Sequence, residues 1–168
     1  MPAVRPAAAA DLPALTALYN HYVVHTPITF DVEPFEPEQR RAWLDSHAGG
    51  RYRLLVAVDG NAIAGYASTS RWRPKAAYDT TVESTVYVRH DLVGRGIGRL
   101  LYDALFAAMA DQDVLTIVAG VALPNPASIA FHERCGFRQV GVFREVGRKF
   151  DRFWDVAWLQ RPCHPAHR

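Results

Sequence analysis

The sequence has few cysteines, no long apolar run and no block of like charges. Cys135 and Cys163 are its only cysteines and cannot form a disulfide framework, so a reducing, cytoplasmic location is expected. No apolar stretch approaches the roughly 18 residues that a membrane-spanning helix needs, so no membrane contact is expected. The alanine run at residues 7–10 is too short for the core of a signal peptide.

Length and charge further restrict the class of protein. The net charge is +2, and acidic and basic residues are interspersed, so no basic stripe predicts nucleic-acid binding. A chain of 168 residues with 49% hydrophobic content fits one domain, expected at residues 1–161 with a frayed tail at 162–168. His21 and His25 are four residues apart but lack a third ligand, so no metal site is expected.

A glycine-rich turn between a strand and a helix is the most informative feature. Apolar spacing from Ile97 onward predicts an amphipathic helix, whose first turn offers free N–H groups to an anion such as phosphate. The strand end and turn comprise Val86, Tyr87, Val88, Gly94, Arg95, Gly96, Ile97, Gly98 and Arg99. An ordinary strand-to-helix turn would explain the same glycines, so this pattern alone leaves two interpretations open.

A second segment, with signals for both the start and the end of a helix, follows at residues 125–137. Asn125 suits a helix N-cap, Pro126 suits the first helical position, and Gly136 suits the position after the helix. Together the two segments resemble the GNAT superfamily of N-acetyltransferases, with its motifs Q/R-x-x-G-x-G/A and N-x-x-A-x-x-x-Y-x-x-x-G-F. The departures from those motifs are Val93 at the first position of one, and Ser128 and His132 in the other.

The order of predicted elements agrees with this resemblance. Strands are expected at 3–6, 54–58, 62–70, 80–88, 115–121, 139–146 and 154–160, and helices from Asp11, over 37–47, from Ile97 and from Pro126. The resemblance implies an α/β N-acetyltransferase (GNAT) fold. Its central sheet is expected to be mixed and mostly antiparallel, with helices on both faces and central strands that splay apart.

The segment at residues 77–88 narrows the resemblance to one subfamily. It is similar to phosphinothricin N-acetyltransferases and to relatives that acetylate methionine sulfoximine and methionine sulfone; weaker matches extend over roughly residues 3–161. This implies an acetyl-CoA-dependent enzyme that acetylates the α-amine of a small amino-acid-like molecule, as a homodimer. A protein or other small-amine acetyltransferase, and a non-catalytic acyl-CoA-binding sensor, remain the alternatives.

The resemblance also implies where acetyl-CoA binds. The exposed edge of residues 86–88 is expected to pair with the pantetheine, and the N–H groups of residues 94–99 to hold the diphosphate, with charge from Arg95 and Arg99. Asn125 is expected to contact the pantetheine, and Ser128 is expected to belong to the cofactor-binding residues. A purely structural role for Asn125 as a helix cap stays equally open.

Two titratable residues are the candidates for catalysis. Glu83 lies three residues before Val86, at the position of the subfamily's proposed general base, and would accept the proton of the acceptor amine directly or through water. A strand carboxylate paired with a nearby arginine is the alternative. His132 stands where many superfamily members have a tyrosine that acts as general acid. A structural histidine on the helix, with its hydrogen bonds satisfied, is an equally open interpretation.

The acceptor site is expected around the loop before the central strand. Arg73 and Lys75 flank Pro74 and are expected to hold an α-carboxylate or a phosphinate, unless this is simply a solvated basic loop. Phe30, Trp72 and Tyr78 are expected to form walls for the acceptor side chain, although core positions would suit them as well.

Overall fold

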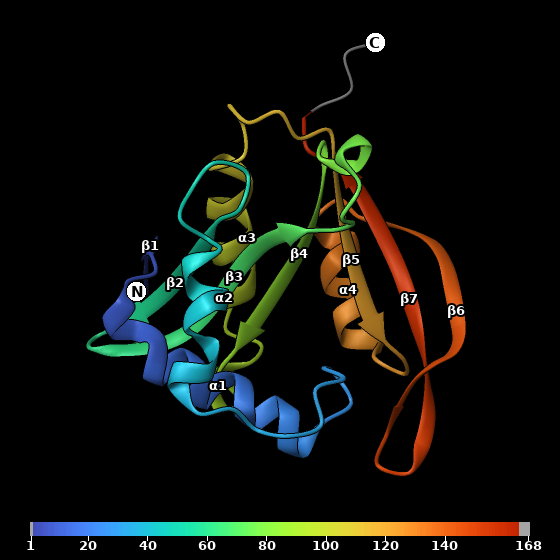
Figure 1. The fold of residues 1–168 in the computed structure, drawn as a ribbon, viewed down its shortest axis with the longest axis horizontal. Helices are drawn as coiled ribbons and strands as arrows, with labels where there is room; N and C mark the ends of the chain where they lie inside the picture. Colours follow the sequence, from blue (N-terminus) through green and yellow to red (C-terminus); the bar gives the residue numbers. More distant parts are fainter. Residues whose placement is uncertain (1, 165–168) are drawn as a thin grey trace.

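The computed structural model describes residues 2–164, which form one seven-stranded sheet in the order β1-β2-β3-β4-β5-β7-β6 (Figure 1). The strands are β1 (Ala3–Pro6), β2 (Leu54–Asp59), β3 (Ala62–Arg71), β4 (Thr81–Val88), β5 (Thr116–Ala122), β6 (Arg138–Lys149) and β7 (Arg152–Pro162). The helices are α1 (Leu12–His25), α2 (Arg41–Asp45), α3 (Ile97–Ala107) and α4 (Pro126–Arg134). Short 3₁₀ turns lie at Ala9–Asp11 (η1), Pro37–Arg40 (η2), Ala76–Tyr78 (η3) and His90–Leu92 (η4).

The pairing between β4 and β5 is the unusual part of the sheet. It is parallel, whereas the other neighbouring strands pair antiparallel. Pairing extends only from Thr81 to Glu83 on β4, although β4 continues to Val88. The two strands therefore separate beyond Glu83, which confirms the predicted mixed sheet with splayed central strands.

Helices cover both faces of the sheet. On one face, α3 buries Leu101 and Leu105 against the strands, together with Phe137, which lies between α4 and β6. On the other, α1 packs Leu15 and Leu18 on aromatic residues of β3 and β4. Figure 1 shows α1 and α2 in front of the sheet and α3 behind it. Each fully buried aliphatic side chain contributes about 1.5–3 kcal/mol, so these two layers hold the central strands in place from both sides.

Four local expectations differ from the structure. The segment expected as one helix over 37–47 is a 3₁₀ turn followed by the five-residue α2. Asp11 occupies the N-cap position of α1, but its side chain does not cap the helix, because its carboxylate accepts from the Ala8 N–H and pairs with Arg5 at 2.7 Å. Strands β6 and β7 are longer than expected and form a hairpin. The expected start of the frayed tail at 162 is wrong, because β7 includes Pro162 and Cys163 is buried; residues 165–168 lie outside the described residues.

Gly65 offers a direct test of how tightly β3, β4 and α3 pack. A Cβ atom at Gly65 would lie 2.8 Å from the carbonyl oxygen of Tyr87 and 3.2 Å from a methyl group of Leu101. We expect Gly65→Ala to lower the free energy of unfolding by about 1–3 kcal/mol, because the backbone of β4 must shift. Urea unfolding followed by circular dichroism measures this change.

Gly141→Ala is the matched control, because Gly141 lies on β6 and no atom lies within 4 Å of where its Cβ would be. We expect this control to stay within about 0.5 kcal/mol of the wild type. Equal stabilities of the two variants would contradict the close approach of β3 to β4.

Candidate active site

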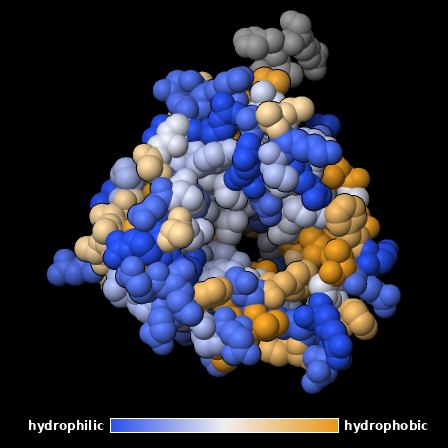
Figure 2. Space-filling view, in the orientation of Figure 1, coloured by the Kyte–Doolittle hydropathy of each residue, from blue (hydrophilic) through white to orange (hydrophobic). Residues whose placement is uncertain are grey.

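The gap between β4 and β5 exposes backbone donors. The N–H of Arg89 donates to Ala64 on β3, and N–H groups alternate between the two edges of a strand. The N–H groups of Val86 and Val88 therefore point toward the gap. The Tyr22 hydroxyl donates to the carbonyl of Val88 from α1 and ties down the end of the strand. Figure 2 shows a hollow near the centre of this face of the molecule.

The glycine turn opens a second set of donors at the start of α3. Gly94 and Gly96 have φ angles of +85° and +81°, which glycine adopts without strain, and no atom lies within 4 Å of where their Cβ atoms would be. The first α3 hydrogen bond runs from Leu100 to Gly96, so the N–H groups of Ile97, Gly98 and Arg99 have no partner within residues 2–164. This open turn fits a diphosphate.

Three residues of the predicted phosphate site have additional or different roles. Gly98 allows α3 to approach α4, because a Cβ there would lie 3.3 Å from the ring of Phe131. Arg99 pairs with Asp103 at 2.8 Å, so its charge is partly engaged along the helix. The N–H of Arg95 reaches the carbonyl of Leu92 at 3.4 Å, while its side chain is exposed at the turn.

Asn125 caps α4, as one of the two interpretations of the sequence predicted. Its Oδ1 accepts from the N–H of Ser128 at 3.1 Å. A shallow groove of about 460 Å³ begins at this cap. The groove is lined by Leu123, Pro124, Asn125, Pro126, Ile129, Ala130 and Glu133. This largely apolar surface suits an extended chain such as pantetheine.

Glu83 lies where β4 and β5 begin to separate. It is the last residue of β4 that pairs with β5, opposite Val118, and it lies across from Ser70 on β3. Burial raises the pKa of its carboxyl group, and the charge of Arg73 partly opposes this effect. In the described chain the carboxylate forms no hydrogen bond or ion pair, so it is available to accept a proton at the mouth of the gap.

His132 lies on the opposite face of β4, behind the gap. It is only 5% exposed, and burial lowers its pKa, so the ring is neutral. Its Nδ1 donates to the carbonyl of Ser128 at 2.8 Å, which leaves Nε2 to accept from the Tyr102 hydroxyl at 3.0 Å. Tyr102 in turn lies 3.3 Å from Ser84 Oγ, which reaches the carbonyl of Val118. This network joins α4, α3, β4 and β5.

A cavity of about 300 Å³ opens on the face of the sheet that carries Glu83. It lies between α1, α2 and strands β3 and β4, and it is lined by Tyr19, Asp31, Phe35, Arg40, Trp43, Tyr66, Ser68, Ser70, Thr85 and Tyr87. None of these residues was expected from the sequence to belong to the acceptor site. The alternating Ser68 and Ser70 on a mostly buried strand are the one pattern that could have indicated a polar cavity.

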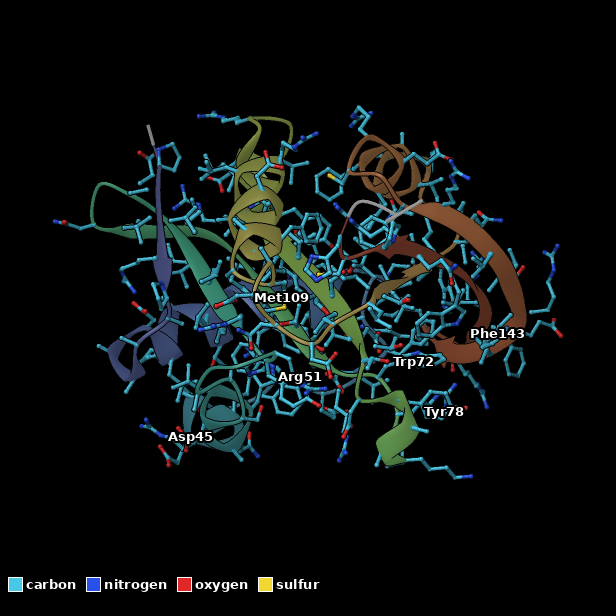
Figure 3. All side chains as sticks on the ribbon, turned by 90° about the horizontal axis from the view of Figure 1, so that it is seen from above. Asp45, Arg51, Trp72, Tyr78, Met109 and Phe143 are labelled. Carbon is cyan, nitrogen blue, oxygen red and sulfur yellow. The ribbon has the colours of Figure 1, made fainter. Side chains whose placement is uncertain are left out.

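The predicted acceptor residues divide into two groups. Trp72 and Tyr78 meet edge to face at 5.1 Å on the loop before β4, and Arg73 stacks on Trp72 at 5.2 Å (Figure 3). Lys75 is exposed on the same loop. Phe30 lies elsewhere, in contact with Gly147 on β6.

The contact of Phe30 joins the α1–α2 loop to the β6–β7 hairpin. A Cβ at Gly147 would overlap the Phe30 ring at 2.2 Å, so a larger residue there would displace the ring. Beside it, Nζ of the buried Lys149 donates to the carbonyl of Thr29 at 2.8 Å. The loop that carries Phe30 and Asp31 is therefore held against the hairpin on the acceptor side of the gap.

Comparisons with known proteins show which family the chain resembles. A family model described as an acetyltransferase (GNAT) domain matches residues 4–158. The phosphinothricin N-acetyltransferase of Streptomyces coelicolor is 59% identical over 95% of both chains. The L-methionine sulfoximine/L-methionine sulfone acetyltransferase of Pseudomonas paraeruginosa is 38% identical over 97% of this chain and 95% of its own.

A solved structure extends the likeness to the three-dimensional fold. It is that of a GNAT superfamily phosphinothricin acetyltransferase from Sinorhizobium meliloti in complex with acetyl-CoA. The two chains are 31% identical and superpose with a TM-score of 0.90, over 96% of this chain and 88% of that one.

The neutral, buried state of His132 predicts a pH effect on stability. Because burial lowers its pKa below the ordinary value of 6.5, protons bind more readily to the unfolded chain. The contribution of His132 is therefore complete above that value and is lost as the pH falls below it. We expect the melting temperature of His132→Gln to depend less on pH between about 7.5 and 5 than that of the wild type.

His47→Gln is the matched control, because burial also lowers the pKa of His47 at a site remote from the gap. The two substitutions should remove separate parts of the pH dependence of the melting temperature, and their effects should add in the double variant. Identical pH profiles for the wild type and His132→Gln would contradict a neutral His132 in the fold.

Proposed function

The chain belongs to the GNAT family of acetyltransferases, and we propose that it acetylates the α-amine of a small amino-acid-like acceptor. Phosphinothricin, methionine sulfoximine and methionine sulfone are the leading acceptors, because the relatives named for them match nearly the whole chain. The observation that carries the proposal is the position of Glu83, at the separation of β4 and β5 and on the face of the 300 Å³ cavity.

Acetyl-CoA is the donor in this proposal, and its thioester supplies an activated acetyl group. The N–H groups at the start of α3 would hold the diphosphate, with Arg95 adding charge. The free edge of β4 would pair with the pantetheine amides, and the groove at Asn125 would hold its chain. A backbone N–H of Val86 or Val88 would donate to the carbonyl oxygen of the thioester.

Glu83 is the proposed general base. An amino acid presents its amine in the protonated form near neutral pH, so a group must remove a proton before the amine can act as nucleophile. Burial raises the pKa of Glu83, which makes this carboxylate a stronger base than an exposed one. It accepts the proton directly or through one water molecule.

Arg73 is the proposed partner of the acceptor's α-carboxylate. Its positive charge acts on Glu83, so a carboxylate bound to Arg73 would bring the α-amine of the same molecule toward the base. Trp72 and Tyr78 form the aromatic wall beside it. Lys75, on the same exposed loop, would add positive charge near the entrance.

The remaining proposals concern the state of the protein in the cell. Cys135 and Cys163 are both free thiols, which supports a reducing compartment such as the cytoplasm. Five exposed apolar side chains lie on the hairpin of β6 and β7, namely Val140, Phe143, Val146, Phe150 and Phe153. Figure 2 shows hydrophobic surface on this side of the molecule. This patch supports a homodimer.

The role of Glu83 is tested by Glu83→Gln. With saturating acetyl-CoA, we expect kcat for methionine sulfone to fall by about 10²-fold near neutral pH, because the amine keeps its proton. The loss should shrink at high pH, where the amine is already neutral, and the affinity for acetyl-CoA should be unchanged. Release of CoA measured across the pH range gives kcat, and calorimetry gives the Kd of acetyl-CoA.

Glu38→Gln is the matched control, because Glu38 is an exposed carboxylate in η2, away from the gap, and should leave the rate unchanged. Wild-type turnover by Glu83→Gln at every pH would place the base elsewhere. Acetylation of peptide amines in preference to the three small acceptors would instead favour a protein acetyltransferase.

The dimer is tested by sedimentation velocity at micromolar concentration. We expect a mass of twice the 18.8 kDa of one chain, and a single-chain mass after Phe143→Glu, which places a charge in the apolar patch. Leu115→Glu changes a comparably exposed apolar residue outside the patch and should leave the mass unchanged. A wild type that sediments as one chain would contradict the dimer.

A further inference from the structure

Arg40 is a buried cation that the proposed mechanism does not use. It is 6% exposed, and its guanidinium lies between two aromatic rings, 4.4 Å from the centroid of Tyr19 and 3.9 Å from that of Trp43. One of its five N–H donors bonds to the carbonyl of Leu15 at 3.2 Å. The stacking fixes the plane of the guanidinium, so the remaining donors have a defined direction.

No carboxylate in residues 2–164 lies within ion-pair distance of Arg40. Asp31 lines the same cavity, but its carboxylate accepts from the Tyr19 hydroxyl instead. The guanidinium also lies beside the Tyr66 hydroxyl, where Arg40 opposes the rise that burial causes in the pKa of Tyr66. No nitrogen of Arg40 is both sealed from solvent and without a partner, and Arg40 lines the cavity, so its remaining donors are accessible there. A buried charge without a counter-ion is unfavourable, and a ligand oxygen in the cavity would offset that cost.

The cavity runs along β3 and β4 from Ser70, the strand neighbour of Glu83, to Arg40. Its floor consists of Ser70, which is paired with Glu83, then Ser68 beside Thr85, and then Tyr66 beside Tyr87 under α1 and α2. The four residue steps from Glu83 to Tyr87 span about 13 Å of strand. That length accommodates an amine at Glu83, a short carbon chain and a polar head at the far end.

We infer that Arg40 determines acceptor specificity by donating hydrogen bonds to the oxygen atoms at the head of the acceptor's side chain. The inference rests on the proposed function, because it takes the α-amine to lie at Glu83 and the α-carboxylate at Arg73. The molecules that fit are amino acids whose side chain ends in a sulfur or phosphorus atom bearing oxygen. The two-pronged edge of a guanidinium matches two acceptor atoms on one centre.

This assignment changes the role expected of Lys75. Lys75 is exposed on the loop before β4 and lies outside the residues that line the cavity. A flexible ammonium in water gains little from one more contact, whereas a clamped guanidinium in a cavity has already lost its side-chain freedom. Arg40 therefore binds the oxygen atoms of the head group, and Lys75 contributes positive charge at the entrance of the site.

The test compares two acceptors that differ only at the head. Methionine sulfone carries two oxygens on sulfur, and methionine carries none. The variant Arg40→Met keeps a long side chain but removes the donors, and Arg40→Lys keeps the charge without the two-pronged edge. We expect Arg40→Met to raise KM for methionine sulfone by about tenfold or more, with kcat and the KM or inhibition constant of methionine nearly unchanged.

Arg73→Ala is the matched control, because loss of the carboxylate partner should weaken both ligands by the same factor. Circular dichroism and the Kd of acetyl-CoA check the fold of each variant, and Arg40→Lys decides the question if Arg40→Met does not fold. It should also weaken methionine sulfone more than methionine. An equal effect on both ligands in the folded variant overturns the role of Arg40.

A binding measurement separates this inference from the proposed function. Calorimetry with CoA present gives the Kd of methionine sulfone and of methionine without turnover. If the wild type acetylates none of the three leading acceptors but Arg40→Met or Arg40→Lys selectively weakens methionine sulfone binding, the proposed reaction fails and the role of Arg40 stands. If the wild type does not bind methionine sulfone at all, the role of Arg40 is overturned.

Discussion

The short parallel pairing of β4 with β5 is the constraint on which the rest of the site depends. Only three residues of each strand pair, from Thr81 to Glu83 on β4. Beyond them the backbone donors of β4 that face β5 have no strand partner, whereas those on the other edge still pair with β3. A donor in a sheet interior needs another partner, and an extended amide-bearing chain supplies one. The same separation leaves Glu83 at the point where donor and acceptor molecules would meet.

The separation of the two strands is maintained from both faces. On the α1 side, the Tyr22 hydroxyl bonds to the carbonyl of Val88 and fixes the free end of β4. On the α3 side, His132, Tyr102 and Ser84 form a buried hydrogen-bonded network that reaches β5 through Val118. Each polar atom of this network is satisfied only when the strands keep this spacing, so the network specifies the geometry of the gap.

Charge is distributed unequally between the surface and the site. Surface cations such as Arg5 and Arg99 have carboxylate partners at 2.7 and 2.8 Å. Glu83 and Arg40, in contrast, lie in partly or largely buried positions without an ion-pair partner among the described residues. Buried charged groups without a partner lower the stability of the fold. A binding site retains them because a bound ligand supplies the missing partner.

The sequence by itself determined the element order, the glycine turn and the helix that begins after Asn125, because local patterns encode hydrophobic period, caps and positive φ angles. It also offered Glu83 as the candidate base, through its position before Val86 and the resemblance of residues 77–88 to one subfamily. It did not reveal Arg40, Asp31 or the cavity, because these depend on α1 and α2 meeting β3 and β4 across long distances in the chain. The burial of His132 against Tyr102, and the contact of Gly98 with Phe131, likewise arise only when α3 and α4 pack together. Local patterns specify elements, whereas the side chains that share a cavity are decided by tertiary packing.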